Sequence, residues 1–157
     1  MKLSVRSTWE KNRGGFTLIE LLIVVAIIGV ISAIALPNLL NAIDKSKQKR
    51  TMSDLRTIGT AVEAYGTDTA CYPFSIADWA TLKPILSPFF IKQPPDGDGW
   101  SNTWDASTTA SGSSYTLASY GKDGTLSARP GGQTSDFNCD ILFTHGQFYQ
   151  WPEGSQS

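Results

Sequence analysis

The strongest pattern in the chain is a continuous apolar segment near its N-terminus. No charged residue occurs from Leu21 to Ile43, which is enough length to cross a bilayer as a helix. Residues 16–36 are apolar on nearly all sides, as is typical of a membrane span or of a helix packed among its own copies. One carboxylate, Glu20, lies within this segment, and in hydrocarbon it needs a partner that neutralises it. The segment therefore predicts a buried or membrane-embedded helix with one special polar position.

Beyond this segment the pattern becomes amphipathic. Apolar residues recur at three- and four-residue spacing over residues 52–65, so one stripe of the helix should face a globular core. We expect one helix of about 50 residues from Phe16, ending near Gly66. Such a helix is longer than a small domain is wide, so its N-terminal half must project and be covered by lipid or other subunits. Pro37 lacks an amide donor and predicts a kink or local break near Gly29–Pro37.

From Cys71 onward, turn-forming residues interrupt the apolar pattern. Residues 78–86 predict a short helix with irregular, proline-rich surroundings. The runs 104–106 and 115–120 flank a Ser/Gly turn and predict a hairpin. Residues 141–151 are aromatic-rich and predict a final strand. The expected fold class is α+β, with the C-terminal half of a long N-terminal helix packed on a small antiparallel sheet.

Charge is distributed unevenly along the chain. Residues 1–15 carry four basic side chains and one acidic, whereas residues 51–157 carry five basic and eleven acidic. A basic leader before an apolar segment keeps that end cytoplasmic, so we expect the acidic remainder to be exported. The basic cluster at residues 45–50 is a weak footprint for nucleic acid, which is not an expected partner. A solvated helix face, or pairing with acidic groups of a neighbouring subunit, explains it better.

The remaining reactive side chains do not predict an enzyme. Cys71 and Cys139 both lie in the exported part, where an oxidising compartment favours a disulfide between them over the alternative of two buried thiols. Neither a C-x-x-C motif nor a nearby histidine accompanies them, so they do not predict a metal site. His145 is the one histidine and precedes a glycine, so a surface turn is expected rather than a catalyst. Motifs for nucleophilic serine, phosphate and dinucleotide sites do not occur.

The segment Arg13-Gly14-Gly15-Phe16-Thr17-Leu18-Ile19-Glu20 resembles the prepilin peptidase site of the type IV pilin and type II secretion pseudopilin superfamily. The resemblance implies cleavage between Gly15 and Phe16, N-methylation of Phe16, and Glu20 at the fifth position of the mature chain. Glu20 can then pair with the cationic amino group of a neighbouring subunit and act in assembly. The simpler alternatives are a polar residue favoured by the helix dipole and an uncleaved signal anchor. Pro37 falls at the family's helix-breaking proline.

Two further segments resemble the major pseudopilins of type II secretion systems. Residues 98–104, Asp-Gly-Trp-Ser-Asn-Thr-Trp, look like the family's Asp-Pro-Trp-Gly-Asn-Pro-Tyr segment. Residues 119–124 and 138–141 are similar to the family's calcium loop. The resemblance implies Ca²⁺ bound by the following residues: Asp123, Asn138, Asp140, Asp136 as a spare ligand, and the carbonyl of Tyr120. Considered without the resemblance, acidic turn residues that cap the backbone are the simpler explanation.

The resemblance also implies an organisation of the chain. It consists of a cleaved leader (1–15), a transmembrane or filament-core helix (16–43), an amphipathic half of that helix (44–68) and a periplasmic domain (69–157). The subunit would reside in the bacterial inner membrane as a single-pass protein and polymerise head to tail into the periplasmic pseudopilus, which drives folded proteins outward. The implied partners are further copies of itself, prepilin peptidase, the inner-membrane assembly platform and minor pseudopilins.

Two alternative functions remain open at this level. The first is the major subunit of a surface type IV pilus, used for adhesion, motility or DNA uptake, which shares the whole N-terminal module. The second is a membrane-anchored periplasmic binding module that uses Trp100, Trp104 and Trp151 as a platform. Core or interface packing is the stronger expectation for these tryptophans.

Overall fold

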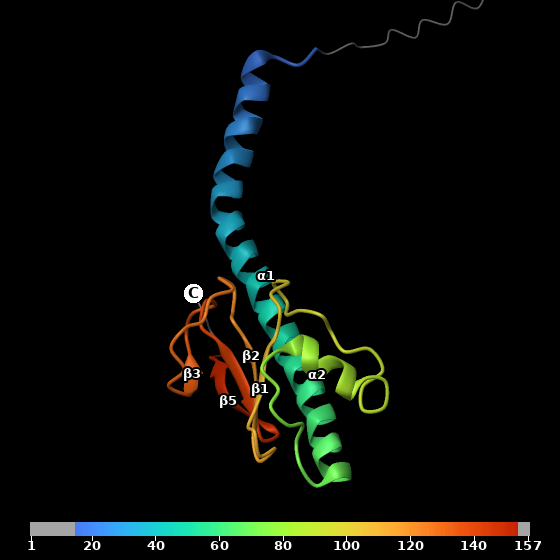
Figure 1. The fold of residues 1–157 in the computed structure, drawn as a ribbon. Coiled ribbons are helices and arrows are strands. Elements are labelled where there is room, and N and C mark those ends of the chain that lie inside the picture. The colour runs from blue at the N-terminus through green and yellow to red at the C-terminus, as the bar shows by residue number, and fades with distance from the viewer. Residues whose placement is uncertain (1–14, 154–157) are drawn as a thin grey trace, which may run out of the picture. The chain divides into compact units, whose positions relative to one another are not determined.

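The computed structural model describes residues 15–153, so the predicted leader, apart from Gly15, lies outside the described residues. The elements, in chain order, are α1 (Leu18–Thr69), α2 (Trp79–Leu86), β1 (Asp105–Thr108), β2 (Tyr115–Ser119), β3 (Gly132–Thr134), β4 (Ile141–Thr144) and β5 (Gln147–Pro152) (Figure 1). The chain divides into two compact units, Met1–Asn38 and Leu39–Ser157. The second unit contains the whole globular domain.

Local sequence signals begin and end α1. The Thr17 hydroxyl accepts a hydrogen bond from the Glu20 amide at 3.3 Å, and the Glu20 carboxylate accepts one from the Thr17 amide at 2.8 Å. This reciprocal pair is a capping box, which satisfies two amides that a helix start leaves free. At the other end, Ala70 has a φ of 62°, and this left-handed residue ends the helix. Gly66 lies inside the helix, and its missing side chain makes room for the Tyr72 ring, which would lie 2.8 Å from a Cβ at this position.

Pro37 lies inside α1, which continues through it. The sequence predicts a kink or a local break at Pro37; the local break does not occur, and the kink stays a prediction. Proline removes one amide donor from a helix of 52 residues, and the bonds on both sides of it remain. The side-chain amide of the next residue, Asn38, also donates to the carbonyl of Ile34 at 3.4 Å, which adds a polar contact beside the missing bond.

The sheet has the strand order β1-β2-β4-β5-β3. The predicted hairpin is confirmed as β1 and β2, but the predicted final strand is in fact two strands, β4 and β5. His145 and Gly146 separate them with φ values of 48° and 77°, as a two-residue hairpin turn requires, so His145 is a turn residue as expected. The sheet is mixed rather than purely antiparallel, because β3 joins the free edge of β5 in the parallel direction.

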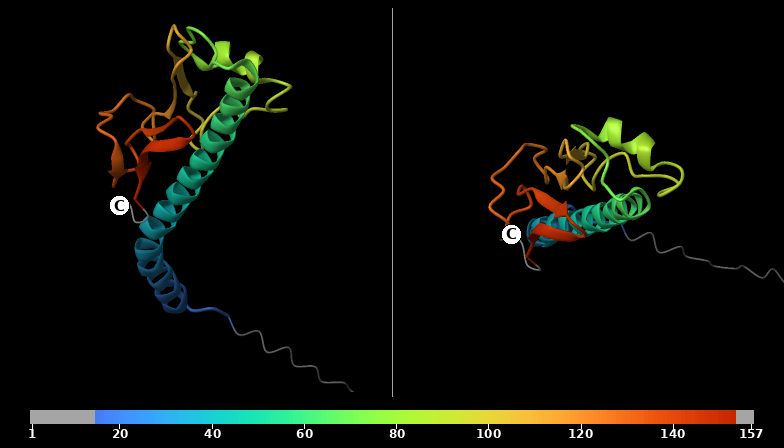
Figure 2. Two further views of the ribbon diagram at one scale, coloured as in Figure 1. Left: turned by 90° about the horizontal axis from the view of Figure 1, so that it is seen from below. Right: turned by 60° about the horizontal axis from the view of Figure 1, so that its bottom comes forward.

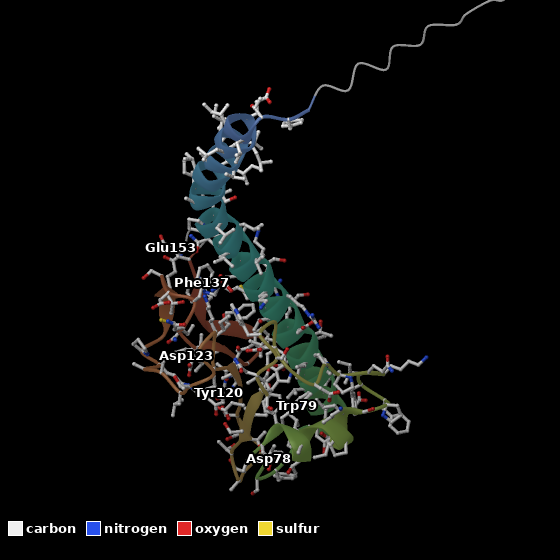
Figure 3. The ribbon with its side chains drawn as sticks, turned by 90° about the horizontal axis from the view of Figure 1, so that it is seen from above. Asp78, Trp79, Tyr120, Asp123, Phe137 and Glu153 are labelled. Atoms are coloured by element: carbon white, nitrogen blue, oxygen red, sulfur yellow. The ribbon has the colours of Figure 1, made fainter. Side chains whose placement is uncertain are left out.

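The hydrophobic core lies where the C-terminal half of α1 meets α2 and the sheet (Figures 1 and 2). Asp78 caps α2 by accepting a bond from the amide of Thr81 at 2.7 Å, and Trp79 then points into the core with 4% of its surface exposed (Figure 3). Gly59 lets the sheet approach α1, since a Cβ there would lie 2.1 Å from the Phe143 ring. The principal core side chains come from all three parts: Leu55, Ile58, Val62, Trp79, Leu82, Leu86, Leu117, Ile141 and Phe143. The α+β prediction is confirmed.

Candidate functional site

The first candidate site is the apolar surface of α1 between Leu18 and Ile43. The large apolar side chains of this part are between 42% and 86% exposed. Its most apolar window has a mean hydropathy of 2.9 and no buried residue, and among the described residues this is the one helix long and apolar enough to cross a membrane. Scattered apolar side chains are normal on soluble proteins, but a continuous surface of this extent needs lipid or other subunits to cover it.

The predicted processing and assembly residues lie at the start of this surface. Gly15 and Phe16 precede α1, and Phe16 is 82% exposed. Glu20 accepts hydrogen bonds from both the amide and the hydroxyl of Thr17, each at 2.8 Å. Within one chain Glu20 therefore caps its own helix. Its pairing with Phe16 of a neighbouring subunit stays a prediction.

The second candidate site is the loop of residues 98–104, which we call the docking loop. Asp98 is 4% exposed and organises the loop from within. One oxygen accepts bonds from the amides of Trp100 and Asn102 at 2.9 and 2.8 Å, and the other accepts one from the Ser119 hydroxyl at 2.6 Å. Amide and hydroxyl donors to an ionised carboxylate are strong, so Asp98 joins the loop to the end of β2.

The docking loop attaches directly to α1. The Gly99 amide donates to the buried Thr51 hydroxyl at 2.9 Å, and Trp100 Nε1 donates to Asp44 Oδ1 at 3.2 Å. A Cβ at Gly99 would lie 2.3 Å from the carbonyl oxygen of Lys47, so helix backbone and loop backbone are in direct contact. The segment identified in the sequence by resemblance thus fixes the domain-facing half of α1.

Asp44 is a functional residue that the sequence reasoning missed. It is 7% exposed, and Lys122 from the loop after β2 donates to its second oxygen at 2.8 Å. Burial raises the pKa of Asp44, but hydrogen bonds from Lys122 and Trp100 and the charges of Lys122 and Lys47 outweigh it, so its pKa lies below the ordinary value of 3.8. The available signal was its position, since Asp44 lies 7 and 11 residues before Thr51 and Leu55, on the stripe that faces the domain.

The structure gives the predicted calcium ligands separate local contacts. Asp123 caps a turn by accepting bonds from the amide and hydroxyl of Thr125 at 3.1 and 2.8 Å. Asp136 accepts a bond from the amide of Asn138 at 3.0 Å, while Asp140 is fully buried. Over residues 15–153, no group of three or more His, Cys, Asp or Glu side chains is placed to hold a metal ion. Calcium takes six to eight oxygen ligands, and this arrangement of donors does not fit it.

The two cysteines are free thiols. Cys71 lies near the start of β2, because the amide of the next residue, Tyr72, donates to the carbonyl of Gly112 in the turn before β2. Cys139 lies near the other end of β2, because Ile141, two residues later, pairs with Ser119. At about 3.3 Å per residue, the length of β2 separates the two by roughly 15 Å, and a disulfide requires Cα atoms within about 7 Å. The structure contradicts the predicted disulfide.

The three tryptophans proposed as an alternative binding platform make contacts within the domain. Trp104 is 3% exposed and its Nε1 donates to the carbonyl of Pro95 at 3.0 Å. Trp100 binds α1 through Asp44, and Trp151 lies in β5 beside β3. The aromatic-rich residues 141–151 therefore belong to β4 and β5, and β5 lies between β4 and β3 in the sheet.

Comparison with known proteins gives two family matches. Residues 11–36 match the model described as the prokaryotic N-terminal methylation motif, and residues 38–141 match that of type II secretion system (T2SS), protein G. The chain is 31% identical over 127 residues to the type II secretion system core protein G of Escherichia coli (strain K12), covering 74% of this chain and 86% of the relative. The core protein G of Pseudomonas aeruginosa is 29% identical over 141 residues, covering 84% and 95%. No solved structure matches the chain significantly.

Proposed function

The chain belongs to the family of type II secretion system protein G, and on this premise we propose that it is a structural subunit that polymerises into the pseudopilus of that system. One observation carries the proposal beyond the family match. The core of the domain is built from residues 55 onward, while the apolar side chains between Leu18 and Ile43 remain exposed. Because the domain has its own core without them, these side chains are available for the membrane and for other subunits.

The apolar half of α1 suits both surroundings. Before assembly the subunit is held in the inner membrane by this helix, with the basic leader on the cytoplasmic side and the domain in the periplasm. On assembly, the helix exchanges lipid for the helices of its neighbours, and this exchange changes little hydrophobic free energy since both surroundings are apolar. Polar groups and shape must then decide the register of the subunits.

Glu20 is the polar group that meets this need. A carboxylate in an apolar medium is unfavourable unless it is neutralised, and the amino group of processed Phe16 is a cation at the same end of a neighbouring helix. Cleavage after Gly15 by prepilin peptidase would create that amino group, and its methylation keeps the charge. The remaining partners we propose are the inner-membrane assembly platform and minor pseudopilins. The proposal includes no catalytic role for the chain.

A deletion strain tests the proposal against the surface pilus. Loss of several extracellular proteins with intact surface fibres supports the pseudopilus, whereas lost fibres with a normal set of secreted proteins would make the chain a pilin. If the deletion strain shows neither of these changes, both the pseudopilus and the pilus functions are refuted.

Complementation of the deletion strain then tests Glu20. We expect Glu20→Ala to be processed but to restore no secretion, and Glu153→Ala, which removes an exposed carboxylate after β5, to restore it fully. Normal secretion with Glu20→Ala would refute the assembly role of this residue.

A further inference from the structure

Asp140 is a fully buried carboxylate, with none of its surface exposed. A buried charge is stable only where hydrogen-bond donors and a counter-charge replace water. Its Oδ1 accepts bonds from the amide and hydroxyl of Ser127 at 3.2 and 2.9 Å, and its Oδ2 accepts one from Arg129 Nε at 2.7 Å. The positive partner of Asp140 is thus Arg129, which belongs to the loop between β2 and β3, whereas Asp140 lies directly before β4.

The same guanidinium reaches β1. Arg129 Nη2 donates to Asp105 Oδ2 at 2.9 Å, and Arg129 Cζ lies 5.7 Å from the centre of the Tyr120 ring. Burial lowers the pKa of Arg129, but its hydrogen bonds to Asp140 and Asp105 and their charges raise it above the ordinary value. A permanently charged group therefore joins the start of β1, the residue before β4 and the loop between β2 and β3.

We propose that Arg129 is the structural cation of the segment between β2 and β4 (residues 120–140), in the role that the resemblance assigns to calcium. A divalent cation bound to Asp140 would lie beside the Arg129 guanidinium, whose Nε is 2.7 Å from Asp140 Oδ2, and the two positive charges would repel each other. Two of the other implied ligands, Asp123 and Asp136, are used as turn caps (Figure 3 shows the loop with Tyr120 and Asp123 labelled). The folded domain then needs no calcium. This inference is independent of the proposed function.

A second buried side chain holds the same segment between β2 and β4. Gln150 is fully buried, and its Nε2 donates to the carbonyl of Asp140 at 2.9 Å while its Oε1 accepts a bond from the Gly131 amide at 3.2 Å. Gln150 belongs to β5, which lies beyond residues 38–141 matched by the family model. Thus β5 contributes a side chain that binds both Gly131 and Asp140, in the segment where Arg129 neutralises Asp140.

Thermal unfolding of the full chain in detergent micelles, followed by near-ultraviolet circular dichroism, tests the proposal. The wild-type chain should show the same Tm in excess EGTA and in millimolar Ca²⁺, and this comparison needs no variant. A wild-type Tm that falls in EGTA or rises with Ca²⁺ would overturn the proposal. Arg129→Gln should lower Tm by on the order of 10 °C in both solutions, since it leaves Asp140 buried without its partner.

Two further variants separate this role from a general loss of charge. Lys49→Gln is the matched control, because it removes one cation from an exposed side chain, so Tm should barely change. The double variant Arg129→Gln with Asp140→Asn should have a higher Tm than Arg129→Gln alone, because the unpaired buried charge is gone. A double variant no more stable than Arg129→Gln would contradict the pairing.

Discussion

Replacement of Gly99 by alanine should detach the docking loop from α1. The added Cβ would lie 2.3, 2.8 and 2.9 Å from the carbonyl oxygen, carbonyl carbon and Cα of Lys47, all of them backbone atoms inside a helix. Gly99 is not among the described glycines with a positive φ, so alanine is compatible with its backbone conformation and the effect is steric. Since an ordinary carbon–oxygen contact is about 3.3 Å, the loop must move by roughly 1 Å.

This movement has a calculable effect on stability. The bond from the Gly99 amide to Thr51, now 2.9 Å, becomes too long, and the bond from Trp100 to Asp44, now 3.2 Å, is strained with it. Loss of one hydrogen bond lowers the free energy of unfolding by about 1 kcal/mol, and a buried polar group left without a partner lowers it by about 1–3 kcal/mol. We expect the free energy of unfolding to fall by about 2–4 kcal/mol, which lowers Tm by on the order of 10 °C.

Thermal unfolding of the full chain in detergent, followed by tryptophan fluorescence, measures this change. Trp100 should also report it directly, because its indole leaves Asp44. Gly29→Ala is the matched control, since a Cβ at Gly29 meets nothing within 4 Å in the single chain. A Gly99→Ala chain with the same Tm as the Gly29→Ala chain would refute the argument that backbone contact holds the loop.

Two other predictions follow from the electrostatics and the cysteines. The pKa of Asp44 is lowered on folding, so its stabilising contribution is complete above the ordinary value of 3.8 and is lost as the pH falls through the lower folded value. Denaturant midpoints between about pH 2 and pH 5 should therefore depend less on pH in Asp44→Asn than in the wild-type chain; equal pH dependence would contradict this. When the protein is isolated without a reducing agent and then unfolded, both Cys71 and Cys139 should be alkylated. The double variant Cys71→Ser with Cys139→Ser should keep the Tm of the wild-type chain. A covalent bond between the two in mass spectra would overturn the free-thiol assignment.

Most local features of the fold could be predicted because neighbouring residues determine them. The capping box of Thr17 and Glu20 and the cap of α2 by Asp78 each satisfy amides within three residues. The β1–β2 hairpin likewise follows from two apolar runs around a Ser/Gly turn. The His145-Gly146 pair carried a turn signal as well, although the sequence pattern around it was interpreted as one strand.

Several wrong or untested predictions concern contacts between residues that are distant in the chain. Whether Cys71 meets Cys139 depends on the register of β2 and β4, which no local pattern specifies. The implied calcium ligands all lie between β2 and β4. However, Arg129, which is 11 residues before Asp140 and 24 after Asp105, donates to the buried carboxylate among them, that of Asp140. Asp44 likewise acquires its role from Lys122, 78 residues later.

The sequence by itself determined the apolar segment from Leu21 to Ile43, its processing motif and Glu20, and with them the family and the expected route to a filament. These depend on hydrophobicity and adjacent residues, which act before any domain folds. Only the tertiary structure decided that the docking loop binds α1 through Gly99 and that Arg129 neutralises Asp140. Those contacts depend on burial, since charge and shape become specific only where water is excluded by residues far apart in the chain.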